Sequence, residues 1–203
     1  MVKAWYPSSL RTAADRLHYY ASVFDTVEVD STFYGLPSET TSRLWAERTP
    51  AGFVFHIKAF AMLTRHGVKP EQLPPTLRSS QTFQLDRQGR ILHPSPELRG
   101  EVFELFASAL EPLKAQGKLG LVLMQFPPYF VANEANREYL EYSLRRLAPL
   151  DTAVEFRHAS WLEGESASST LDFLASLGAA YVCVDEHRIE ADNVLPPLAA
   201  TTA

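Results

Sequence analysis

Residues 153–162 read AVEFRHASWL, an apolar beginning followed closely by Glu155, Arg157 and His158. An unbroken apolar run is typical of a strand that is buried on both faces of a parallel sheet. Charged side chains are almost never fully buried unless they are paired. Glu155 and Arg157 are two residues apart, so in a strand they point to the same face. The stretch therefore predicts a buried strand with a charged end.

Four other stretches share this apolar beginning and polar end. Together with the first, the predicted strands are 26–34, 52–60, 119–128, 152–161 and 179–187. The segments between them have helical spacing of their apolar residues, and the predicted helices are 8–24, 38–50, 96–120, 133–150 and 166–180. Alternating strands and helices indicate parallel strands joined by crossover helices. We predict an α/β fold, either an open sheet or a barrel.

One domain over residues 1–203 accommodates all these elements. The chain has 203 residues, of which 46% are hydrophobic, enough for one sizeable core. No repeat, linker or low-complexity run divides it. Residues 67–96 are rich in proline and polar residues and are too long for a plain connection, so we expect a loop or small hairpin excursion there.

The charge and the single cysteine limit the class of protein. A net charge of -5 argues against a generally basic nucleic-acid coat, although it leaves a local basic patch open. Cys183 cannot form an internal disulfide, and a buried thiol fits a reducing compartment. The N-terminus lacks an apolar signal core, and no run approaches the roughly 18 apolar residues of a membrane span. We expect a cytoplasmic protein without a membrane contact, and the sequence does not predict its oligomeric state.

The polar residues gather toward the ends of the predicted strands. Parallel α/β folds place their ligand sites at the carboxyl ends of the strands. The acidic candidates for catalysis are Glu28, Asp30, Glu155 and Asp185. The candidates for ligand binding are His56, Lys58, Arg65, His66, Gln125, Arg157 and Trp161.

Three interpretations of this set remain open. The charges can simply satisfy one another as structural ion pairs across the sheet. A divalent metal suits the carboxylates and His56, although no metal-binding motif is present and Lys58 and Arg157 would repel a cation. A clamp for phosphate or carboxylate suits Lys58, Arg65, His66 and Arg157, with Glu155 or Asp30 as general base.

The chain resembles the YecE-like family, a domain of unknown function. The matching stretches are VEVDSTFYGLPS (27–38), TPAGFVFHIKA (49–59), LTRHG (63–67), GKLGLVLMQFPP (117–128) and AVEFRHASW (153–161). The resemblance implies a TIM-barrel-like fold whose activity is not established. Many members have Asn where this chain has Asp30, which makes an acid at that position specific to this branch.

The same resemblance predicts an incomplete barrel. Family members begin with a further strand before the segment that corresponds to Trp5, Tyr6 and Pro7, and they continue past residues 195–203 into another strand. By that comparison this chain holds strands two to six of eight and is truncated at both ends. An open sheet of this kind exposes two edges and part of the barrel interior.

Two functions follow from these residues. The first is a hydrolase-like barrel that acts on a phosphorylated or nucleic-acid-like ligand, with a divalent metal as a possible cofactor. The alternative is a non-catalytic binding protein for an anionic small molecule or single-stranded nucleic acid. A metal requirement favours the first, and steep salt dependence of binding without turnover favours the second.

Overall fold

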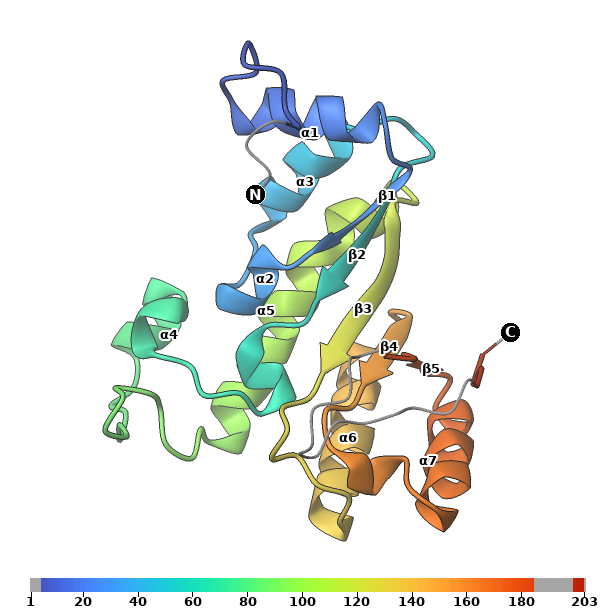
Figure 1. The fold of residues 1–203 in the computed structure, drawn as a ribbon. Helices are drawn as coiled ribbons and strands as arrows, with labels where there is room; N and C mark the ends of the chain where they lie inside the picture. The colour runs from blue at the N-terminus through green and yellow to red at the C-terminus, as the bar shows by residue number, and fades with distance from the viewer. Residues whose placement is uncertain (1–4, 185–198, 203) are drawn as a thin grey trace.

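The computed structural model describes residues 5–184 and 199–202. It contains one five-stranded parallel sheet in the order β1-β2-β3-β4-β5 (Figure 1). The strands are β1 (Thr26–Val29), β2 (Val54–Lys58), β3 (Leu119–Gln125), β4 (Thr152–Glu155) and β5 (Ala180–Tyr181). The predicted α/β fold with parallel strands is confirmed.

The helices pack mainly against one face of the sheet. They are α1 (Ala13–Ala21), α3 (Glu39–Glu47), α5 (Pro96–Ala115), α6 (Glu134–Leu147) and α7 (Glu165–Ser176). Figure 1 shows α3, α5 and α6 behind the strands, and α1 beside the amino ends of β1 and β2. No helix in the described ranges is both long and apolar enough to cross a membrane.

The strand that was predicted at 26–34 is shorter than expected. β1 ends at Val29, and Ser31–Tyr34 forms the short helix α2. The strand predicted at 152–161 likewise ends at Glu155, and Ala159–Trp161 form the 3-10 helix η3. In both places the chain turns as soon as it leaves the sheet, so the polar residues beyond each strand lie on turns.

The two faces of the sheet differ in chemistry. The face toward the helices is apolar and carries Phe55, Ile57, Val122, Met124 and Val154, all buried in the main core. The opposite face carries polar side chains beside apolar ones such as Leu123, and the register places Glu28 beside His56 and Gln125 beside Glu155. This polar face is partly open, since Glu28 is exposed on the edge strand β1.

The excursion after β2 contains short helices and one bridge. It begins after the 3-10 helix η1 (Ala61–Thr64) and includes η2 (Pro70–Gln72) and α4 (Pro75–Ser79). The predicted hairpin is present only as a single antiparallel bridge between Leu85 and Ile91. Ile91 N donates to Val68 O at 2.8 Å, and this hydrogen bond joins the later part of the segment to its beginning.

The edge strand β5 is capped by a side chain from the end of the chain. Thr201 Oγ1 accepts from Tyr181 N at 2.8 Å and donates to Ala179 O at 2.7 Å. Asp185 and the rest of the predicted strand end lie outside the described residues.

Candidate functional site

Asp30 and Lys58 form an ion pair just beyond the ends of β1 and β2. Lys58 Nζ donates to Asp30 Oδ1 at 2.8 Å, and the ammonium lies 5.2 Å from the centre of the Phe33 ring. The Asp30 backbone begins α2, but its carboxylate does not cap that helix and turns toward Lys58 instead. Because Lys58 is largely buried and Asp30 is mostly exposed, the pair presents its carboxylate to solvent.

Thr32 positions this pair and was missed by the sequence analysis. Its side chain is buried, and Oγ1 lies 2.6 Å from Lys58 O and 2.8 Å from Val29 O. The hydroxyl thus ties the first turn after β1 to the end of β2. The sequence offered one sign of this role, a threonine that follows an acidic residue by two positions at the end of a predicted strand.

A second polar group connects β3, β4 and the turn after β4. Glu155 Oε1 accepts from Gln125 Nε2 at 2.7 Å and forms an ion pair with Arg157 Nε. The Glu155 side chain is only 7% exposed, whereas Arg157 is 34% exposed. The predicted pair at positions 155 and 157 is therefore present, and Gln125 supplies an additional donor to the buried carboxylate.

His66 is held on the turn that follows η1. Its Nδ1 lies 2.9 Å from Thr64 Oγ1, and its ring meets the Phe33 ring edge-on with centroids 4.9 Å apart. Burial, with a smaller effect from the nearby positive charge of Lys58, lowers the pKa of His66 to about 4. At neutral pH the imidazole is therefore uncharged and sits in the same neighbourhood as Lys58 and Phe33.

His56 has a structural partner that accounts for its position. The register between β2 and β3 shifts after Phe55, and Leu121 N donates to His56 Nδ1 at 3.2 Å inside this irregularity. A Cβ on Gly120 would lie 2.6 Å from His56 Cε1, so the glycine makes room for the ring. His56 lies on the same face of the sheet as Glu28, but within β2 and before the carboxyl end of that strand.

Two residues that were predicted to bind a ligand, Trp161 and Arg65, have other contacts in the structure. Trp161 is fully buried, stacks on Phe156 and donates from Nε1 to Phe130 O at 2.6 Å, so it is a core residue and does not lie at a site rim. Arg65 has a left-handed backbone with φ of 67°, and its guanidinium lies 3.7 Å from the centre of the Tyr139 ring on α6. Arg65 thus contacts α6, whereas Lys58 and His66, the other predicted members of the clamp, both contact Phe33.

The described residues form no metal-binding cluster. Among them, no three His, Cys, Asp or Glu side chains gather closely enough to hold an ion. Glu28 is exposed on β1, and Asp185 lies outside the described residues. The acids that are placed at the strand ends, Asp30 and Glu155, both contact cations.

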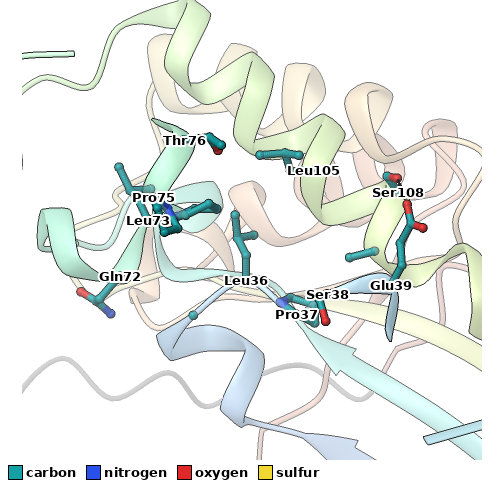
Figure 2. A pocket seen from close by; sticks show the side chains of 13 residues that line it. Leu36, Pro37, Ser38, Glu39, Gln72, Leu73, Pro75, Thr76, Leu105 and Ser108 are labelled. Carbon is teal, nitrogen blue, oxygen red and sulfur yellow. Dashed lines mark hydrogen bonds between the residues drawn. The ribbon is translucent and has the colours of Figure 1, made fainter. Parts of the chain in front are cut away.

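A mainly apolar cavity of about 460 Å³ lies apart from this polar edge (Figure 2). It lies between the connection from α2 to α3, residues 72–76 and α5, and Leu36, Leu73 and Leu105 line it. At one end Ser108 Oγ donates to Glu39 Oε1 at 2.8 Å. None of the predicted site residues lines this cavity.

The fold and site define an α/β protein with a parallel sheet and polar side chains at the carboxyl ends of its strands. The chain belongs to the family described as "Protein of unknown function DUF72", whose family model matches residues 1–203. This confirms the resemblance seen in the sequence.

Known relatives agree with this assignment. The chain is 30% identical over 192 residues to UPF0759 protein YunF of Bacillus subtilis (strain 168), covering 94% of this chain and 60% of YunF. It therefore spans about 60% of the length of that relative.

Two solved structures of the family resemble it. The crystal structure of a DUF72 family protein from Thermotoga maritima MSB8 has a TM-score of 0.68 and 29% identity, covering 97% of this chain and 64% of that one. For a DUF72 family protein from Enterococcus faecalis V583 the TM-score is 0.73 at 24% identity, with 92% and 65% covered, a likeness that shows the fold alone.

Proposed function

We propose that this chain is a hydrolase-like protein of TIM-barrel type that acts on a phosphorylated or nucleic-acid-like ligand at the carboxyl ends of β1 to β4. The observation that supports this most is that the Lys58 ammonium and the His66 ring contact the same side chain, Phe33, with a distance of 5.2 Å from Lys58 Nζ to the ring centre and of 4.9 Å between the two ring centres. A cation that binds an anionic group and a base that can take up a proton are the two parts that such a hydrolysis needs.

Lys58 is suited to receive the anion. An ammonium has three donors, and in the described residues one is used by Asp30, at 2.8 Å. The ammonium also lies 5.2 Å from the centre of the Phe33 ring, a cation–π contact beside the strand ends. A phosphoryl group that replaces the Asp30 contact would keep the charge of Lys58 compensated.

His66 gains proton affinity when such an anion binds. Burial and the Lys58 charge both favour the neutral imidazole in the unliganded protein. A bound dianion offsets the Lys58 charge and attracts a proton to the ring, so its pKa moves back toward neutrality. The imidazole then accepts a proton from the attacking water only while the ligand is present.

Glu155 and Arg157 form the second part of the proposed site, beside the part that holds Lys58 and His66. Their pairing across the end of β4 keeps the buried carboxylate compensated, and Gln125 orients it. In this arrangement Arg157 contacts the ligand, while Glu155 positions Arg157. In this proposal His66 carries the proton transfer.

The test is hydrolysis of p-nitrophenyl phosphate and of a fluorescent single-stranded oligonucleotide by the wild type and His66→Gln. We expect His66→Gln to lower kcat by about a hundredfold or more, the usual size of a general acid-base contribution. His18→Gln on the exposed face of α1 is the matched control and should leave kcat unchanged. Equal turnover in both variants would refute the assignment.

A second candidate function is favoured by the charge pairing itself. Both site carboxylates are engaged with cations, Asp30 with Lys58 and Glu155 with Arg157, which suits a protein that only binds an anionic small molecule or single-stranded nucleic acid. In that case the ligand binds with steep salt dependence and is recovered intact, and Lys58→Met abolishes binding. Turnover of the bound ligand would exclude this alternative.

A further inference from the structure

Two arginines share one tyrosine ring on the far side of the turn that carries His66. The Arg65 Cζ lies 3.7 Å, and the Arg99 Cζ 5.7 Å, from the centre of the Tyr139 ring. The two guanidinium carbons are therefore no farther apart than the sum of these distances. Two like charges at this range repel each other, and the cost is lowered when an anion lies between them.

The arginines have no acidic partner in the described part of the chain. The ion pairs found there use Arg43, Arg145, Arg146 and Arg157, and none of them includes Arg65 or Arg99. Moreover, Arg65 Nε is buried and has no hydrogen-bond partner among the described residues. A buried N–H without an acceptor is costly and is usually explained by a bound water or ion.

The scaffold around the two arginines is fixed by hydrogen bonds. Tyr139 is buried and donates from its hydroxyl to Leu63 O at 3.0 Å. On the other side Tyr129 donates from its hydroxyl to Arg65 O at 3.1 Å. Both contacts hold the turn that directs Arg65 onto the ring, so the guanidinium is preorganised before any ligand arrives.

A third cation lies close to this turn. The Arg90 side chain packs over Gly67, where a Cβ would meet Arg90 Cδ at 2.6 Å. Burial raises the pKa of the Tyr129 hydroxyl, and the positive charge of Arg90 partly offsets that rise. Arg65, which follows η1, and Arg90 of the bridge segment thus both lie at the turn of residues 65–67, while Arg99 of α5 shares the Tyr139 ring with Arg65.

We propose that Arg65 and Arg99 form a second anion-binding site for a tetrahedral oxyanion, the phosphate group of a small molecule, with Arg90 at its edge. Paired guanidiniums present planar forks of N–H donors that match phosphate oxygens, and the bonds are charge-assisted. The Arg65 Nε–H donates to one of these oxygens. This site is separate from the Lys58 and His66 site and does not depend on it.

The experiment is an NMR titration of the arginine Nε–H signals of the full chain with inorganic phosphate, and with acetate at matched ionic strength. We expect the Arg65 Nε–H signal to move in a saturable manner with phosphate. Arg99→Gln should weaken phosphate binding by about tenfold or more, the equivalent of one charge-assisted hydrogen bond. Arg43→Gln, an exposed arginine on α3 that pairs with Glu47, is the control and should leave the affinity unchanged.

The outcomes are distinct from those of the proposed function. Lys58→Met removes the site at the strand ends but should leave the phosphate response of Arg65 intact. If Arg99→Gln does not fold, as judged by its thermal melt, Arg90→Gln tests the same cluster from the bridge segment and should weaken binding. A saturable response to acetate equal to that for phosphate, unchanged affinity in the arginine variants, or no saturable response at all overturns the proposal.

Discussion

Replacing Lys118 by methionine should destabilise the protein without touching the proposed sites. Lys118 precedes β3 and is buried, with 5% of its surface exposed. Its Nζ donates to Ala46 O at 2.5 Å, to Thr49 O at 2.6 Å and to Thr49 Oγ1 at 3.2 Å. The ammonium thus caps the carboxyl end of α3, where the helix dipole favours a positive charge.

The magnitude follows from these three contacts. Methionine keeps the packing of the lysine stem but leaves two carbonyls and one hydroxyl without this donor, and each unsatisfied buried acceptor costs about 1–3 kcal/mol. Removing the buried charge recovers part of this cost, because the ammonium no longer has to be desolvated. We expect Lys118→Met to lower the free energy of unfolding by about 2–4 kcal/mol.

Urea unfolding followed by circular dichroism measures this change. The midpoint should fall while the slope stays constant, since the surface exposed on unfolding is unaltered. Lys114→Met is the matched control, because Lys114 lies on the exposed side of α5 and pairs with Glu111 at 3.5 Å. The control should change stability by less than about 0.5 kcal/mol. A loss for Lys118→Met no larger than that of the control would refute the reasoning.

Three other changes test the strands that carry the site. Gly120→Ala places a Cβ 2.6 Å from the His56 ring and should cost about 1–3 kcal/mol in thermal or urea unfolding, whereas Gly52→Ala, with open space around it, should be neutral or slightly stabilising. Thr32→Val removes the hydroxyl that contacts two carbonyls and should cost about 1–2 kcal/mol, measured the same way; a neutral result would mean that water replaces it. Because the folded-state pKa of His66 is lowered to about 4, the unfolded chain binds more protons between pH 4 and 6.5. The free energy of unfolding should therefore fall as pH drops through that window. A weaker dependence of this free energy on pH in His66→Gln would confirm that His66 causes the effect.

The sheet was predictable because its strands are locally distinct. The run at 119–128 is apolar throughout and ends at two prolines, and β3 occupies Leu119–Gln125 within it. The strand at 26–34 was predicted too long because residues 31–34 are as β-prone as the strand itself. Their helical turn is stabilised by Thr32 reaching Lys58 O, a contact across the sheet that no local pattern contains.

Part of the site was also predictable from local sequence. A period of two places Glu155 and Arg157 on one face, and the structure pairs them. Arg65 could not be placed in this way, because it lies on a turn after η1 with a left-handed backbone, where the alternation of side chains along a strand does not apply. Trp161 lies in η3, the 3-10 helix after β4, and packs in the core against Phe156.

The two proposed anion sites differ in whether a carboxylate already compensates their positive charge. At the strand ends an incoming anion competes with Asp30 for Lys58, so binding there is an exchange of one anion for another. At Arg65 and Arg99 the described residues offer no carboxylate to displace, so an anion relieves a repulsion that already exists. The exchange site discriminates between ligands, because only an anion that binds Lys58 better than Asp30 does can enter. In the described part of the chain the arginine site has no such competitor, and a tetrahedral oxyanion gains the full attraction of both guanidiniums.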